Sequence, residues 1–157
     1  MGLSITDMPI DVEVRRTTAS WALEHWRGDF PEDTIDWYLD VYREAEAMTG
    51  VPVAMVAHLD DRLVGSGLLV ADDGLEGAPE PGPWLAAVFV TIDARGIGVG
   101  GALVEALTKR GHDLGHDTIY LYTESGHGWY ESLGWTRVRT ARLADHDVEV
   151  MRHTVGD

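Results

Sequence analysis

Four glycines fall within six residues of the stretch "DARGIGVGGALVEAL", which covers residues 93–107. An amphipathic helix is predicted directly after them, although glycine disfavours helix formation. The first turn of a helix leaves backbone N–H groups unpaired and carries partial positive charge, and glycines leave these donors uncovered. Arg95 adds a guanidinium at the start of the stretch. The stretch therefore predicts a binding site for the phosphates of a ligand.

A dinucleotide is one ligand that such glycines could hold. Gly96, Gly98 and Gly101 satisfy the pattern G-x-G-x-x-G, and Glu124 follows the next predicted strand. However, five residues, "TIDAR", separate the preceding strand from the first glycine, and only residues 125–157 follow Glu124. A dinucleotide-binding fold needs the turn directly after its strand and a longer second half. We therefore keep the dinucleotide enzyme only as a minor alternative. A Walker loop is excluded, because the sequence contains no Gly-Lys-Ser/Thr.

The elements around the glycines predict a mixed sheet with helices on both faces. The apolar run at 84–90 is typical of a buried central strand. Hairpins joined to one crossover helix indicate a mixed α/β fold, and the length suits one domain. We expect strands at 11–16, 53–59, 63–71, 84–90, 117–123, 136–143 and 148–154. We expect helices after the capping residues 17–20, at 33–48, from Val99 to Leu114, and within 126–135, ending at Gly134.

The composition excludes several classes of protein. The formal net charge of -15 leaves no basic surface for nucleic acid, and no apolar run is long enough to span a membrane. The absence of cysteine excludes disulfides, thiolate metal sites and a cysteine nucleophile, and it fits the cytoplasmic location that we expect. His112 and His116 are four residues apart, but glycines interrupt their helix and no third ligand is evident, so we predict no metal site.

Two segments of the chain resemble the GNAT superfamily of acyl-CoA N-acyltransferases. In "WLAAVFVTIDARGIGVGGALVEAL", Arg95, Gly98 and Gly100 form the pattern R-x-x-G-x-G. The later "YLYTESGHGWYESLGWTRV" is similar to the family's strand and short helix with a tyrosine-x-x-leucine-glycine-aromatic run. The resemblance implies a single N-acetyltransferase domain over residues 1–157. Its sheet would be mostly antiparallel, with six or seven strands and about four helices, and would splay between two central parallel strands.

The resemblance also implies where acyl-CoA, most simply acetyl-CoA, would bind. The backbone of the central strand would pair with the pantetheine arm in the opening between the two parallel strands, and the glycine turn would hold the pyrophosphate. The cofactor-binding residues expected on this basis are Val88, Phe89, Val90, Arg95, Gly96, Ile97, Gly98, Val99, Gly100, Gly101 and Ser125.

The same resemblance assigns catalytic roles. Tyr130 matches the position of the family's frequent general acid, which protonates the departing CoA thiolate. Some members carry a glutamate base on the central strand, but "LAAVFVT" has no ionisable residue. The base therefore stays open between Glu124 and His127, with Glu24 or a water chain as further options. The backbone N–H of Val90 would meet the oxyanion.

These observations predict an acetyl-CoA-dependent N-acetyltransferase that acts on a primary amine, in a small molecule or a peptide, by direct attack in a ternary complex. The acidic composition favours a cationic acceptor. A non-catalytic acyl-CoA sensor of the same fold remains the alternative, because the central strand lacks an ionisable residue. The sequence leaves a homodimer open.

Other conspicuous residues have mainly structural interpretations. The resemblance implies that the first two helices wall the acceptor pocket, so one or two of their aromatic residues could face the apolar part of a substrate: these are Trp21, Trp26, Trp37 and Tyr38. We interpret most of them, and Trp129 with its neighbours Leu133 and Trp135, as packing residues. We interpret His146 as solvated or structural. The acidic loop at 72–80 either borders the acceptor site or is simply solvated.

Overall fold

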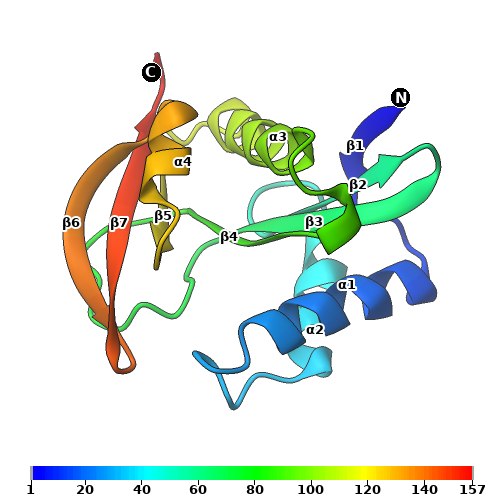
Figure 1. Cartoon of the computed structure of the whole chain (residues 1–157), viewed down its shortest axis with the longest axis horizontal. Coiled ribbons are helices and arrows are strands. Elements are labelled where there is room, and N and C mark those ends of the chain that lie inside the picture. Colours follow the sequence, from blue (N-terminus) through cyan, green and yellow to red (C-terminus); the bar gives the residue numbers. More distant parts are fainter. Residues whose placement is uncertain (1, 157) are drawn as a thin grey trace.

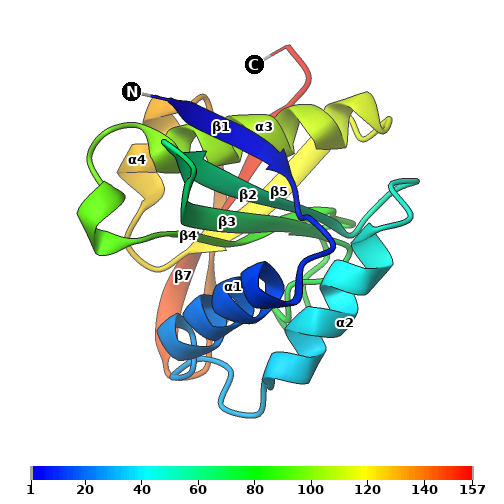
Figure 2. The same cartoon turned by 90° about the vertical axis from the view of Figure 1, so that its right-hand side faces the viewer.

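A computed structural model describes residues 2–156, which form one seven-stranded sheet with helices on both faces (Figures 1 and 2). The strand order is β1-β2-β3-β4-β5-β7-β6, and all neighbours are antiparallel except β4 and β5. This arrangement confirms the predicted mixed, mostly antiparallel sheet with two central parallel strands. Across the same residues, none of the helices combines the length and apolar character that a membrane crossing requires.

The elements predicted from residue 53 onward lie within two residues of the observed bounds. The strands are β1 (Leu3–Asp7), β2 (Val53–Leu59), β3 (Arg62–Val70), β4 (Trp84–Val90), β5 (Thr118–Thr123), β6 (Thr136–Leu143) and β7 (His146–Thr154). The helices are α1 (Val12–His25), α2 (Ile35–Ala45), α3 (Val99–Asp113) and α4 (His127–Ser132), with a short 3-10 helix at Ile92–Ala94.

The prediction for the start of the chain is wrong. Of residues 11–16, expected as a strand, Asp11 is the N-cap of α1 and residues 12–16 begin the helix, and the first strand lies earlier, at β1. The Asp11 carboxylate accepts hydrogen bonds from the backbone N–H groups of Glu13 and Val14, at 2.9 and 3.2 Å. Asp11, rather than residues 17–20, therefore caps the helix. The apolar–polar alternation of "DVEVRR" imitates a strand, but the capping bonds favour a helix.

The second helix is shorter than the predicted span of 33–48. Thr34 caps it, because its side-chain oxygen accepts from the Trp37 N–H at 3.3 Å. The helix ends at Ala45. Together α1 and α2 cover one face of the sheet, whereas α3 covers the other (Figure 2).

A β-bulge redirects the second half of β4. Trp84 and Ala86 pack into the core under α1 and α2, and Leu85 packs into the core under α3, as strand alternation requires. Ala87 has a φ of +54° and packs on the same side as Ala86, so that Val88 turns to the α3 side. The register with β3 shifts at the same place. The bulge therefore changes which side chains the end of β4 presents to each face.

The two parallel strands pair only near the start of β4 and then diverge. In the described chain, Trp84 and Tyr120 are the one register pair between them, and the Tyr120 N–H donates to the Pro83 carbonyl at 2.9 Å. β5 continues along β7, and β4 continues along β3, so the two halves of the sheet separate (Figure 1). The inner backbone edge of β4 after Trp84 is thus left without a strand partner.

An ion pair fastens the long β3–β4 loop to β6. Arg139 donates from Nε and Nη2 to the two carboxylate oxygens of Glu80, at 2.9 and 2.8 Å. The Glu80 side chain is 8% exposed, whereas the Arg139 side chain is 33% exposed, so mainly the carboxylate is protected from water. The hydrogen bonds from Arg139 hold the pKa of Glu80 below its ordinary value of 4.5.

Glu80→Gln should lower the free energy of unfolding at pH 7 by about 2 kcal/mol, because a charge-assisted hydrogen-bonded pair is lost. A carboxylate whose folded pKa is depressed stabilises the fold above its unfolded pKa, and this stabilisation is lost as pH falls through the folded value. The difference from the wild type should therefore shrink below about pH 4. Urea unfolding of the variant and the wild type, at pH 7 and at a pH below about 4, measures this difference in the free energy of unfolding. Asp113→Asn, which breaks the exposed Lys109–Asp113 pair, should change stability by less than about 0.5 kcal/mol. An equal loss for Glu80→Gln at both pH values would contradict the assignment.

Candidate active site

The glycine turn connects the end of β4 to α3. Gly96 and Gly98 have φ values of +81° and +94°, and Gly98 directly precedes the helix. A Cβ at either position would meet nothing within 4 Å, so backbone conformation rather than crowding favours glycine there. Within the described residues, no side chain caps α3 and no acidic residue lies in its first turn. The first N–H groups of α3 are therefore available to an anionic ligand, as the sequence predicts.

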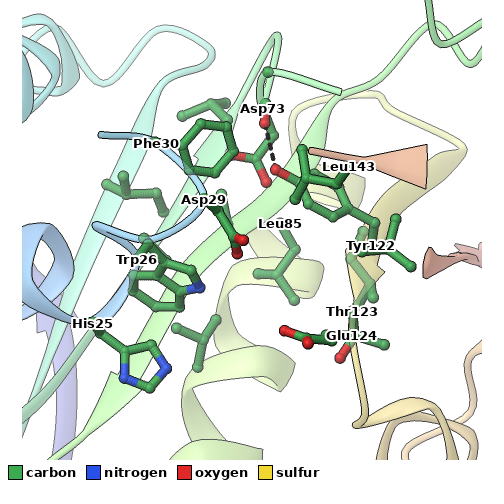
Figure 3. Close-up of a pocket in the computed structure, with 18 of the residues that line it drawn as sticks. His25, Trp26, Asp29, Phe30, Asp73, Leu85, Tyr122, Thr123, Glu124 and Leu143 are labelled. Atoms are coloured by element: carbon green, nitrogen blue, oxygen red, sulfur yellow. Dashed lines mark hydrogen bonds between the residues drawn. The ribbon is translucent and has the colours of Figure 1, made fainter. Parts of the chain in front are cut away.

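A cavity of about 670 Å³ lies where β4 and β5 diverge (Figure 3). Val88 of β4, Tyr130 of α4 and Ser125 line it, and so bring three of the predicted site residues together. The remaining walls come from the end of α1 and the loop after it, from α2, from the β3–β4 loop, and from the β6–β7 hairpin. Residues far apart in the sequence thus enclose one space.

Tyr130 is held by α4 and by aromatic packing. Its N–H donates to the Gly126 carbonyl at 3.1 Å, and its ring lies edge-on to Trp129 and Trp135 at centroid distances of 4.8 and 6.1 Å. Burial raises the pKa of Tyr130 to about 12, so the phenol keeps its proton at neutral pH. Its hydroxyl makes no hydrogen bond to any residue between 2 and 156, which leaves it free to donate to a ligand.

The two candidate bases occupy different places. Glu124, at the end of β5, lines the cavity with a side chain that is 65% exposed. His127, the first residue of α4, does not line it; its charge instead helps to lower the pKa of Glu149 on β7. Glu24 is also absent from the lining. The structure therefore brings Glu124, but not His127 or Glu24, into one cavity with Tyr130.

Sequence analysis did not assign His146 or Asp29 to the site, although both line the cavity near the end of β5. His146, in the β6–β7 hairpin, lines the cavity, and its Nε2 lies 3.4 Å from Oδ1 of Asp29 and 3.7 Å from Oε2 of Glu124. This Nε2 is buried without a hydrogen-bond partner among the described residues. The ligand atoms of the three residues lie within 4.8 Å of one another, so the prediction of a metal-free site stays a prediction. No local sequence signal indicates which segment a hairpin tip will contact.

Aromatic residues that were interpreted mostly as packing also contribute to the cavity. Trp26, Trp37 and Tyr38 line it, while Trp21 packs against Phe89 at a centroid distance of 5.4 Å. The cavity therefore combines aromatic walls with acidic groups from the loops at its rim.

Comparison with known proteins identifies the family. Residues 16–135 match the sequence model of the acetyltransferase (GNAT) family. The chain belongs to this family. No match emerges when the chain is compared with curated proteins by sequence.

Solved GNAT structures share the fold over nearly the whole chain. An aminoglycoside 6'-N-acetyltransferase complexed with coenzyme A has a TM-score of 0.77 at 18% identity, with 98% of each chain covered. The aminoglycoside 6'-N-acetyltransferase of Enterococcus faecium has a TM-score of 0.75 at 18% identity and the same coverage. The ribosomal-protein-alanine N-acetyltransferase of Brucella melitensis has a TM-score of 0.73 at 14% identity, covering 97% of this chain and 99% of that one. At these identities the likeness establishes the GNAT fold.

The other expected cofactor residues of this GNAT chain, Phe89, Val90, Arg95 and residues 96–101, are not among the lining residues of the cavity, but Phe89, Val90 and Arg95 contact one another before the glycine turn. Arg95 donates from Nε to the Val90 carbonyl at 2.8 Å, and its guanidinium lies 5.5 Å from the Phe89 ring centroid. The Trp129 indole is half exposed, and a Cβ on Gly100 would lie 3.4 Å from it. Trp129 therefore packs against the first turn of α3 with a half-exposed side chain. Trp135, by contrast, is buried as expected.

Proposed function

We propose that this GNAT protein is an acetyl-CoA-dependent N-acetyltransferase that acetylates a primary, cationic amine by direct attack in a ternary complex. The observation that carries the proposal is the position of Tyr130 in the acidic cavity where β4 and β5 diverge, while its neighbour Trp129 lies against Gly100 in the first turn of α3. The named acceptors of the structural neighbours, an aminoglycoside and a protein alanine, are amines as well.

The donor half of the proposal rests on backbone groups. The inner edge of β4 after Trp84 lacks a strand partner, and the amides of an extended pantetheine arm would pair with it at residues 88–90 as an added strand. Ser125 lines the adjoining cavity. The N–H groups of residues 96–101 would hold the pyrophosphate, because glycine leaves them accessible and the α3 dipole favours negative charge.

Gly98→Ala should weaken acetyl-CoA binding about tenfold. An alanine forced to a φ near +94° is strained by about 1–2 kcal/mol, and relief of that strain would displace the N–H groups of the turn. Gly115→Ala is the matched control, since Gly115 has a φ of +99°, equally open space and a position beyond the other end of α3. Thermal unfolding should show similar losses for both variants, whereas calorimetry should show weaker acetyl-CoA binding for Gly98→Ala alone. Equal acetyl-CoA affinity in the two variants would contradict this role for the turn.

The acceptor half of the reaction uses the cavity. The amine nitrogen attacks the thioester carbon, and the resulting oxyanion accepts a hydrogen bond from a backbone N–H, for which we propose that of Val90. Before the attack, Glu124 takes one proton from the ammonium group, directly or through a water molecule, so that the nitrogen has a lone pair. After the attack, the nitrogen loses its second proton, which replaces the one that Tyr130 gives to the sulfur. When the C–S bond breaks, the hydroxyl of Tyr130 donates to the thiolate, and the products are the acetamide and free CoA.

The release of free CoA distinguishes the proposed enzyme from the alternative, a non-catalytic acyl-CoA sensor. Glu124 supplies, within the cavity, the ionisable group that the central strand lacks, and this favours the enzyme. We expect a thiol reagent to detect CoA release that depends on both acetyl-CoA and an amine, with the acetylated amine confirmed by mass spectrometry. Binding of acetyl-CoA without release for any member of a broad amine panel would support the sensor instead.

A further inference from the structure

The acceptor cavity carries far more negative charge than one reacting amine requires. Five carboxylates line it, against two histidines, His25 and His146, and no lysine or arginine is among the lining residues of the described chain: the acids are Asp29, Asp33, Asp72, Asp73 and Glu124. Like charges this close repel one another unless a cation joins them. A ligand with a single ammonium group would leave most of this charge uncompensated.

The carboxylates form two groups in the cavity, Glu124 with Asp29 around His146, and Asp73 with Asp33 and Asp72. Tyr122 lies between Asp73 and Glu124. Its hydroxyl donates to the Asp73 backbone carbonyl at 2.7 Å, and Glu124 follows it by two residues, directly after the end of β5. Two residues of strand span roughly 6.5 Å, and the length of the tyrosine ring adds to the separation. In Figure 3, Asp73 and Glu124 lie on opposite sides of the cavity, with Asp29 between them in this view.

The group around Asp73 has no cation of its own. Among residues 2–156, no donor forms a hydrogen bond or ion pair with the Asp73 carboxylate, whereas Asp72 accepts from the Gly74 N–H at 2.8 Å. Burial, followed by the charges of Asp72 and Asp33, raises the pKa of Asp73 well above its ordinary value. A bound ammonium group would relieve both the desolvation and the repulsion.

Apolar side chains separate the two acidic groups. Trp26, Phe30, Leu85 and Leu143 line the intervening wall (Figure 3). A hydrocarbon segment would be buried favourably against them, and the aromatic rings also attract cations. The wall therefore suits a short carbon framework that joins two ammonium groups.

We infer that the acceptor is a small molecule with at least two amino groups on one short framework, and this inference rests on the proposed function. One amine reacts between Glu124 and Tyr130, and a second, as its ammonium ion, is held by Asp33, Asp72 and Asp73. Linear diamines and amino sugars share this chemistry.

Matched pairs of amines test this inference. Diaminobutane is compared with butylamine, and an aminoglycoside with the monoamine glucosamine, by kcat/KM in the CoA-release assay. We expect at least a tenfold preference for the multiply charged member of one pair, and the pair that shows it identifies the framework.

Asp73→Asn should reduce this preference about tenfold. Glu76→Gln is the control, because Glu76 is an exposed acid of the same loop outside the cavity lining. If Asp73→Asn does not fold, Asp33→Asn replaces it.

The outcomes distinguish this inference from the proposed function. Turnover without a preference in either pair, or a preference that survives Asp73→Asn and Asp33→Asn, would overturn the two-amine acceptor while leaving the N-acetyltransferase intact. If no amine releases CoA, the proposed function itself fails, and the inference fails with it.

Discussion

Tyr130→Phe should lower kcat by about 10²- to 10⁴-fold, the range typical of a lost general acid, while acetyl-CoA affinity stays close to that of the wild type. The substitution removes only the hydroxyl, which makes no hydrogen bond within residues 2–156, so packing against Trp129 and Trp135 is retained. Because burial raises the pKa of Tyr130 to about 12, the phenol keeps its proton in the resting enzyme and gives it up only as the C–S bond breaks and negative charge develops on the sulfur.

This high pKa gives the prediction a second readout. A phenol that titrates near pH 12 stays protonated throughout the usual assay range, so its ionisation should cause no decline in wild-type kcat up to about pH 10. The control is Tyr42→Phe, since Tyr42 is also buried, also has a pKa raised to about 12, and lies outside the cavity lining. It should affect stability rather than kcat. Wild-type turnover by Tyr130→Phe would remove the acid assignment.

Two features of the site that depend on residues adjacent in the sequence could be predicted: the glycine turn and the central strand. The glycines before α3 were identified because a run of glycine at the start of an amphipathic helix has few explanations other than unusual φ values and uncovered N–H groups, and Gly96 and Gly98 have such φ values. The run 84–90 was identified as the central strand because it is apolar throughout, and it forms β4 with those bounds. Both features depend on residues adjacent in the sequence.

Features that depend on contacts between distant segments could not be predicted. His146 belongs to the cavity only because the β6–β7 hairpin reaches Asp29, more than a hundred residues earlier in the chain. The bulge at Ala87 is equally hidden, since alanine is not typical of a positive φ and the pairing with β3 determines it. The error at the start of the chain was local instead, because the Asp11 carboxylate caps α1 through N–H groups only two and three residues away, and this capping outweighed a strand-like alternation. In each case a tertiary contact or a capping bond decided between local alternatives.

Glu124→Gln should reduce kcat/KM by about 10²-fold or more at neutral pH, whereas His127→Gln should leave it almost unchanged. The two residues were equal candidates for the base in the sequence, but only Glu124 shares a cavity with Tyr130. A purely structural role for Glu124 would not cause such a loss, because its side chain is 65% exposed and no hydrogen bond in the described chain depends on it.

The pH dependence of the variant distinguishes a base from a binding group. Without a base, the reaction depends on the small fraction of amine that is already neutral, and this fraction grows tenfold with each pH unit below the amine's pKa of about 10. The kcat/KM of Glu124→Gln should therefore rise with a slope near one between about pH 7 and pH 9 and approach the wild-type value. A variant that stays equally impaired across this range would assign Glu124 to binding of the cationic acceptor, and the proton would then leave the amine through the solvent.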